Sequence, residues 1–201
     1  MSGSKGKGCL KGCGCALLII VLIIGVLIGG GVYFVKKSIY TTPDKIVSTS
    51  RELCSYSLPE AFTPVLGMDL KLMKAAAFRA GSESAPQAVV VFTEFSIGEA
   101  NQSAMQAYKE SVLGEIFKGV VITKQETTDL EPLTAADGTE MRRTDRVVKI
   151  KDVENPYHIY ELDYNRNSDM VSVMFFVLDP DMQATADTFI STLAPATAAQ
   201  E

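Results

Sequence analysis

Three cysteines near the amino terminus are the densest group of reactive side chains in the sequence. Cys9, Cys13 and Cys15 lie within seven residues, immediately before a long apolar run. Their spacing supplies three thiolates, whereas a closed structural zinc site takes four ligands. The single histidine, His158, is far away in the sequence. We therefore expect no metal site here.

Two interpretations of these cysteines remain open. S-acylation is chemically sensible, because Cys9, Cys13 and Cys15 would lie beside the lipid. The simpler interpretation, which we favour, is that they serve as small, fairly apolar residues beside the neighbouring glycines. A bacterial lipoprotein signal is excluded, because its cysteine follows the apolar region and these cysteines precede it.

Catalytic side chains are sparse in the rest of the chain. His158 lies in a strand-like pattern with Tyr160 on the same face, which is typical of a sheet residue. Cys54 falls on the apolar face of a predicted helix, so we expect it to be buried. Glu94 and Glu161 would form a carboxylate pair only if their strands were neighbours. The sequence predicts no catalytic residue, no cofactor and no metal, and hence no enzyme.

Charge divides the chain into two parts. Residues 1–37 carry five lysines and no acid, a formal charge of +5, whereas residues 38–201 carry 14 basic and 24 acidic side chains, which gives −10. Duplex binding draws mainly on clustered Lys and Arg, so the acidic part argues against nucleic acid. Arg142, Arg143 and Arg146 cluster, but we expect them on a solvated face.

An uninterrupted apolar segment at residues 16–35 predicts a transmembrane helix. Twenty helical residues span about 30 Å, the thickness of the hydrocarbon core, and Lys36 and Lys37 follow as a cationic stop. A cleaved signal peptide, with Gly29 and Gly31 before the cut, is the alternative. It fits less well, because the apolar run continues after those glycines.

The predicted helix places the protein in the membrane as a single-pass protein. We expect the amino terminus in the cytoplasm and the folded domain on the extracytoplasmic side, although the count of positive charges does not decide the orientation. Gly25 and Gly29 form a GxxxG spacing, which lets two membrane helices approach closely. Small residues are also simply frequent in such helices.

The remaining sequence alternates between helical and strand patterns. Thr42, Pro43 and Asp44 predict a helix start, and Ser96 to Glu99 reads as a capping box before an amphipathic helix. Asp179 and Asp181 flank Pro180 at the start of a last helix. Strands are predicted near 68–80, 88–96, 119–128, 139–151, 157–165 and 170–178, the last at the sheet centre because VSVMFFVL is apolar on both faces.

The resulting fold class is α+β, an N-terminal transmembrane helix followed by one antiparallel-sheet domain of order αββαββββα with helices packed on the sheet. The expected organisation is a basic Cys/Gly-rich tail at 1–15, the transmembrane helix at 16–35, a linker at 36–41, a soluble α+β domain at 42–194 and a flexible tail at 195–201.

This order of elements resembles the Mog1/PsbP-like α/β/α sandwich. The stretch SLPEAFTP after the anchor is also similar to the start of small anchored domains of unknown role. The resemblance implies a binding or assembly role, and it transfers no active-site residues.

Three functions follow as hypotheses. The leading one is a single-pass membrane protein that displays a small binding or assembly domain, with the lipid bilayer and a protein partner or a second copy as its partners. The alternatives are an anchored enzyme using Glu94, Glu161 or Tyr160, and a structural envelope component that oligomerises through Gly25 and Gly29.

Overall fold

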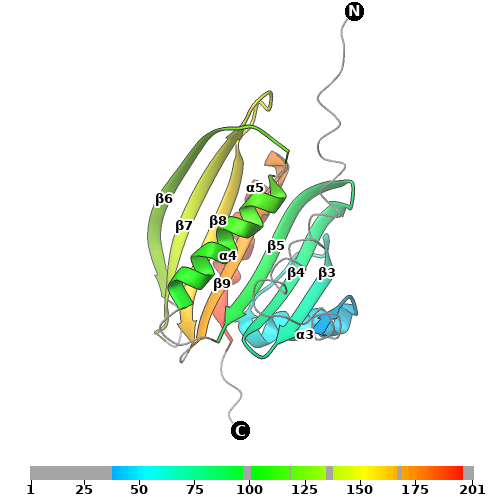
Figure 1. Ribbon diagram of the computed structural model, residues 1–201, viewed down its shortest axis with the longest axis vertical. Coiled ribbons are helices and arrows are strands. Elements are labelled where there is room, and N and C mark those ends of the chain that lie inside the picture. Colours follow the sequence, from blue (N-terminus) through cyan, green and yellow to red (C-terminus); the bar gives the residue numbers. More distant parts are fainter. Residues whose placement is uncertain (1–37, 97–100, 118, 135–137, 167–168, 197–201) are drawn as a thin grey trace, which may run out of the picture.

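The computed structural model describes residues 38–96, 101–117, 119–134, 138–166 and 169–196 (Figure 1). Within these ranges no helix has both the length and the apolar character needed to cross a membrane. The predicted transmembrane helix at 16–35, with Gly25 and Gly29, lies outside the described residues, as do Cys9, Cys13 and Cys15.

An antiparallel sheet is the centre of the fold, as the sequence predicted, but it has eight strands where six were predicted. The strand order is β1-β3-β4-β5-β9-β8-β7-β6, and every neighbouring pair is antiparallel. A second, two-stranded sheet joins β2 and β10. The strands are β1 (Ile39–Tyr40), β2 (Cys54–Ser55), β3 (Phe62–Leu70), β4 (Met73–Ser82), β5 (Ala85–Phe95), β6 (Ile122–Thr134), β7 (Glu140–Ile150), β8 (Tyr157–Arg166), β9 (Asp169–Val177) and β10 (Ala194–Pro195).

In the described part of the chain, three α-helices cover the two faces of the large sheet, which confirms the predicted α+β class. Helix α4 (Asn101–Ile116) crosses one face, and α3 (Pro43–Leu53) and α5 (Gln183–Thr192) lie on the other (Figure 1). A short 3₁₀ helix, η3 (Pro180–Met182), precedes α5, and the Asp179 side chain caps it by accepting the backbone N–H of Asp181. We refer to these two sides as the α4 face and the α3/α5 face.

The core consists of two apolar layers separated by the sheet. In β9, Met174 and Phe176 point to the α4 face while Val173 and Phe175 point to the α3/α5 face. Successive strand side chains alternate between faces, so a strand that is apolar throughout fits the centre of a covered sheet. The predicted central position of this strand is confirmed.

Helix α4 buries the stripe that its sequence predicts. Met105, Tyr108, Val112 and Leu113 are buried against the sheet, and the Tyr108 ring meets Phe95 edge-on with centroids 5.4 Å apart. The spacing of three and four residues places these side chains on one side of a helix. The predicted capping box lies largely in residues 97–100, outside the described residues.

The strand predicted over 68–80 is instead a hairpin. Leu70 pairs with Met73, so Lys71 and Leu72 form a two-residue turn between β3 and β4. Pro64 lies inside β3 at a shift in register. Proline is tolerated there because bulges and edge strands leave its missing N–H without a ladder partner.

The two edges of the sheet differ strongly in length. One edge is β1, which pairs with β3 through only two residues and lies in the predicted linker at 36–41. The other is β6, thirteen residues long, whose side chains are exposed or half-exposed throughout. Two register shifts interrupt the pairing of β6 with β7, and Pro132 lies beside the second.

Candidate functional site

A buried ionic network beneath α4 is the largest group of charged side chains in the core. Lys109 of α4 places its Nζ 2.5 Å from Asp163 Oδ2 and 3.2 Å from Glu161 Oε2, both on β8. Lys109 and Glu161 are almost fully buried. A buried charge is costly unless it is paired and hydrogen-bonded, so each of these three groups depends on the others.

Arg146 of β7 completes the network. Its Nε and Nη2 donate to Glu161 Oε1 at 3.0 and 2.9 Å, and its Nη1 donates to Glu110 Oε1 at 3.1 Å. Gln106 donates to the same Glu110 oxygen at 2.9 Å. Two cations thus face two carboxylates of β8, and the exposed Glu110 links the network to solvent.

This network was not predicted from the sequence. Arg142 is exposed as predicted, but Arg146 of the same cluster is buried, which corrects the expectation of a solvated face. Glu161 and Asp163 stand on alternate positions of β8 and so point to the α4 face, where Lys109 meets them. The sequence did contain one signal. Glu161 and Asp163 stand two residues apart in a predicted strand, and a helix predicted to pack on the sheet carries Lys109.

Two buried polar atoms beside the network have no hydrogen-bond partner within the described part of the chain. They are Asp163 Oδ1 and Ser172 Oγ, whose residues lie directly opposite each other on β8 and β9. On the next strand, Thr93 Oγ1 donates to the Tyr108 hydroxyl at 3.0 Å, and burial raises the pKa of Tyr108 to about 12. A polar row therefore runs across the sheet beneath α4.

The carboxylate pair considered for an enzyme does not form. Glu94 lies on β5 and Glu161 on β8, with β9 between them, and they point to opposite faces of the sheet. Glu94 is paired with Arg166. Tyr160 lies on the α3/α5 face, where Gln183 donates to its hydroxyl. These three groups do not converge on one site.

Cys54 is a buried packing residue, as the sequence predicted. Its thiol donates to the carbonyl of Ala194 at 3.0 Å, and burial raises its pKa to about 11. The attacking form of a cysteine is the thiolate, so this environment disfavours a nucleophile. His158 is also the sheet residue expected, half-buried, with Nδ1 3.3 Å from Asp145 Oδ1.

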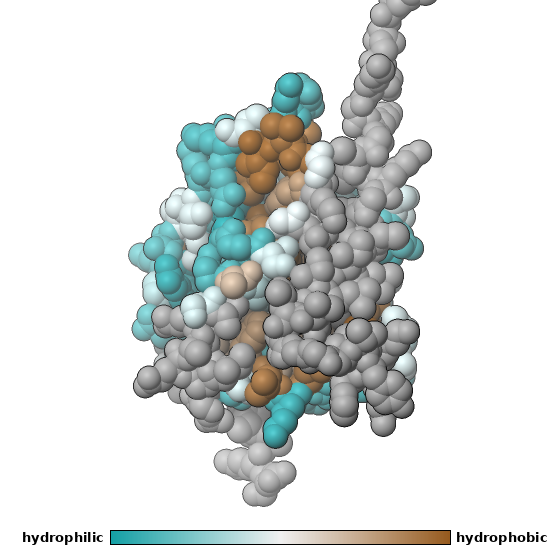
Figure 2. Space-filling model, viewed as in Figure 1, coloured by the Kyte–Doolittle hydropathy of each residue, from teal (hydrophilic) through white to brown (hydrophobic). Residues whose placement is uncertain are grey.

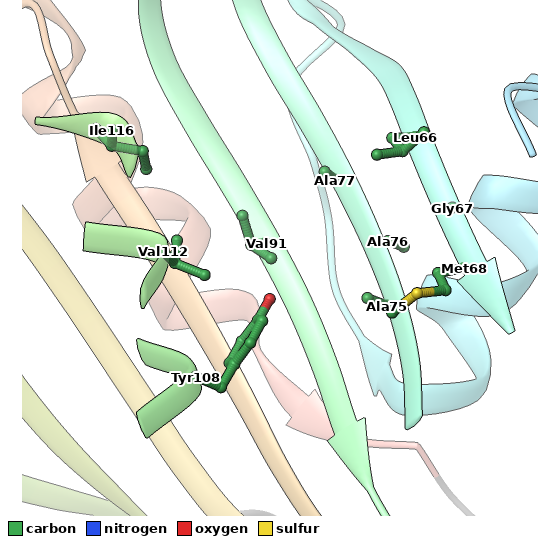
Figure 3. Close-up of a pocket in the computed structure, with 10 residues that line it drawn as sticks. All are labelled: Leu66, Gly67, Met68, Ala75, Ala76, Ala77, Val91, Tyr108, Val112 and Ile116. Atoms are coloured by element: carbon green, nitrogen blue, oxygen red, sulfur yellow. The ribbon is translucent and has the colours of Figure 1, made fainter. Parts of the chain in front are cut away.

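An apolar cavity separates α4 from β3 and β4 (Figure 3). Its volume is about 20 Å³, room for about one water molecule, and none of the ionic network lines it. In Figure 3, Tyr108, Val112 and Ile116 of α4 stand on one side, and small side chains of β4 on the other. This cavity is too small for a substrate. The lining residues are Leu66, Gly67, Met68, Ala75, Ala76, Ala77, Val91, Tyr108, Val112 and Ile116.

Three large apolar side chains are exposed at one end of the sheet, and we call them the apolar tip. They are Val121, Ile122 and Val153, which are 62%, 42% and 40% exposed. The backbone N–H of Lys151 donates to the Val121 carbonyl at 2.9 Å, which joins the start of β6 to the turn after β7. Apolar atoms gather at the top of the view in Figure 2, at the end of the molecule where β6 begins.

Of the comparisons with known proteins, only the comparison with solved structures found similar proteins. No family model and no curated protein match the chain. The solution structure of cyanobacterial PsbP (CyanoP) from Synechocystis sp. PCC 6803 is similar over 83% of this chain and 96% of its own, with 13% identity and a TM-score of 0.43. A crystal structure from Bacteroides thetaiotaomicron VPI-5482 is similar over 82% of this chain, with 11% identity and a TM-score of 0.40.

The chain spans half of that Bacteroides chain. A PsbP structure is thus among the solved structures similar to this chain. The similarity is distant, and the functional argument below rests on the residues of this chain.

Proposed function

We propose that the protein is a single-pass membrane protein that displays a non-catalytic binding domain and contacts a protein partner through the apolar tip. The observation that carries this proposal is the exposure of Val121, Ile122 and Val153 at one end of an otherwise well-packed sheet. Contiguous exposed apolar side chains with polar neighbours are typical of protein contact sites.

The position of the apolar tip favours a partner that lies away from the membrane. The chain enters the domain at β1, which pairs with Gly67 and Met68 near the carboxyl end of β3. In the antiparallel sheet this is the end opposite to the start of β6. Ten strand residues span about 33 Å, so the sheet separates the apolar tip from the anchor.

Charge favours a protein over the lipid surface as the partner of the apolar tip. Residues 38–201 carry a formal charge of −10, and a surface of anionic lipids repels an acidic domain. An uncharged apolar surface on a partner protein would bury the apolar tip without that repulsion.

The alternatives have less support. An enzyme using Glu94, Glu161 or Tyr160 has less support, because Glu161 points to the α4 face and is paired with Lys109, whereas Glu94 is paired with Arg166 and Tyr160 lies on the α3/α5 face. Oligomerisation through Gly25 and Gly29 stays a prediction, because both residues lie outside the described part of the chain. The cytoplasmic amino terminus and the S-acylation of Cys9, Cys13 and Cys15 likewise stay predictions.

The experiment compares two aspartate substitutions at opposite ends of the sheet. Val121→Asp places a charge in the apolar tip, and Leu72→Asp places one in the β3–β4 turn, where Leu72 is 41% exposed. Full-length variants are cross-linked in native membranes, solubilised gently and captured. We expect a protein captured by the wild type and by Leu72→Asp to fall at least tenfold with Val121→Asp.

Two outcomes would contradict the proposal. In the first, Val121→Asp and Leu72→Asp capture the same proteins in the same amounts. In the second, the wild type is recovered alone in repeated captures. A circular dichroism spectrum and a melting temperature for each variant verify that both fold.

A further inference from the structure

One large apolar side chain is exposed at the end of the sheet opposite to the apolar tip. Among the described residues, Leu72 is the one such side chain outside the apolar tip, with 41% of its surface exposed. It lies with Lys71 in the two-residue turn between β3 and β4, away from the start of β6 (Figure 1). A single exposed leucine is ordinary on a protein surface, so the surroundings of Leu72 decide what it contacts.

The backbone holds Leu72 in this exposed position. Leu70 pairs with Met73, which closes the turn, and the carbonyl of Leu72 accepts the backbone N–H of Ser96 at 3.1 Å. Met73 is buried in the apolar layer of the α4 face. A slip of one residue that buried Leu72 would expose Met73 instead. Leu72 therefore stays at the surface.

The chain enters the domain beside this turn. Strand β1 runs antiparallel to β3, with Ile39 opposite Met68 and Tyr40 opposite Gly67. The chain therefore reaches Ile39 from the end of the sheet at which β3 turns into β4. Leu70 lies two residues beyond Met68, so the turn extends about 7 Å past Ile39 in that direction.

The length of the linker limits how far the turn can lie from the bilayer. In the proposed function, on which this inference rests, the predicted anchor ends at Val35. The four residue steps from Val35 to Ile39 cover at most about 14 Å when fully extended. Because the turn extends about 7 Å back toward the anchor, at most about 7 Å separate it from the hydrocarbon core. The headgroup layer is about 5 to 7 Å thick on each side of that core, so the turn reaches it.

We propose that the β3–β4 turn contacts the lipid surface, with Leu72 in the headgroup layer and Lys71 beside the lipid phosphates. Leu72 gains by leaving water, and a lysine beside it can keep its charged end at the level of the headgroups. Asp69 and Glu52 lie next to Lys74 and balance the charge of the two lysines. The contact consequently depends on Leu72 and needs no anionic lipid.

This contact gives the domain a second attachment to the membrane besides the anchor. Two attachments hold the sheet upright on the bilayer and direct the apolar tip away from it. The partner of the apolar tip then has access to Val121, Ile122 and Val153 without competition from lipid.

The experiment uses tryptophan as a depth probe, because the sequence contains none. Full-length Leu72→Trp is reconstituted into phosphatidylcholine vesicles, with and without lipid that is brominated on its acyl chains near the headgroup. Bromine quenches only tryptophans close to it, and tryptophan favours the interface of a bilayer. We expect brominated lipid to lower the emission of Leu72→Trp at least twofold. Lys71→Trp, on the same turn, is the second probe and should lose emission as well.

Val121→Trp is the matched control at the opposite end of the sheet, where Val121 is 62% exposed. Ten strand residues, about 33 Å, separate this end from the turn. Brominated lipid should therefore change the emission of Val121→Trp by less than about a tenth.

Three outcomes would overturn the proposal. Unquenched emission from both turn variants, in folded chains that stay in the vesicles, would place the turn in water. Equal quenching of Leu72→Trp and Val121→Trp would show that the domain has no fixed orientation. Emission of Leu72→Trp that is shifted to the blue in native membranes, but unquenched in pure lipid vesicles, would assign the turn to a protein.

Two further measurements separate this proposal from the proposed function. An alkaline wash of the vesicles before each emission spectrum tests the anchor, so a released chain and an unquenched chain are told apart. Circular dichroism and a melting temperature for each variant verify that it folds.

Discussion

Lys109 is the residue on which the buried ionic network depends most. It contacts both Glu161 and Asp163, and its Nζ is almost fully buried. Lys109→Met would leave two carboxylates with Arg146 as their remaining cation. Removing one partner of a buried pair costs about 3 to 5 kcal/mol, and we expect a loss of unfolding free energy of this size in urea.

Lys74→Met is the matched control for this prediction. Lys74 forms an ion pair with Glu52 at 2.9 Å, and the two side chains are 33% and 53% exposed, far more than that of Lys109. Ion pairs near the surface contribute about 0 to 1 kcal/mol, so Lys74→Met should lose little unfolding free energy. Equal losses of unfolding free energy for Lys109→Met and Lys74→Met would contradict this prediction, because the buried network would then stabilise the fold no more than the Lys74–Glu52 pair does.

The position of a single residue could be predicted from the sequence only where the residues next to it in the chain determine that position. Cys54 is buried and His158 is a half-buried strand residue, as local patterns indicated, although Cys54 lies in β2 and not on the helix where it was predicted. Arg146 did not, because its burial arises from α4, more than thirty residues away in the sequence. Pairing between a helix and a distant strand leaves no periodic signal in either segment.

At the level of elements, the attachment of β1 depends on a glycine. A Cβ at Gly67 would lie 2.1 Å from the ring of Tyr40, which crosses β3 at that point. Gly67→Ala must therefore displace Tyr40, and we expect a loss of about 1 to 3 kcal/mol. Hydrogen exchange should show faster exchange at Ile39 and Tyr40 than in the wild type.

Gly114→Ala is the matched control on α4. A Cβ at Gly114 meets no atom within 4 Å, and alanine is favoured over glycine within a helix by about 1 kcal/mol. This variant should be slightly more stable than the wild type. Unchanged exchange at Ile39 and Tyr40 in Gly67→Ala would contradict the role assigned to the glycine.

The sequence predicted the elements well where hydrophobic period and turn residues agree. The three helices and the central strand β9 follow from such patterns. The β3–β4 hairpin was missed because Lys71 and Leu72 carry no turn signal, and the alternation of Leu70, Lys71 and Leu72 continues a strand pattern. The position of the turn is set by the pairing of β3 with β4.

For the whole molecule, the predicted anchor leads to a direct test. Ile23→Arg combined with Ile24→Arg adds about 5 to 7 kcal/mol of insertion cost, comparable to the total gain from the apolar residues of the segment. We expect the wild type to stay in the membrane after an alkaline carbonate wash and this variant to be released.

Ile23→Leu combined with Ile24→Leu keeps the segment apolar and should behave as the wild type. The mass of the membrane-bound chain distinguishes the anchor from a cleaved signal peptide. A mature chain that begins after Gly31 would contradict the anchor.

The exposed edge strand β6 has a consequence for the membrane-anchored protein that we propose. Chains tethered in a plane meet at far higher local concentration than chains in solution, and a long open edge would let sheets join side by side into polymers. Lys124 and Glu126 as paired charges, Pro132 and two bulges all interrupt this edge. With the anchor that we propose, these interruptions of β6 would keep neighbouring chains from joining edge to edge.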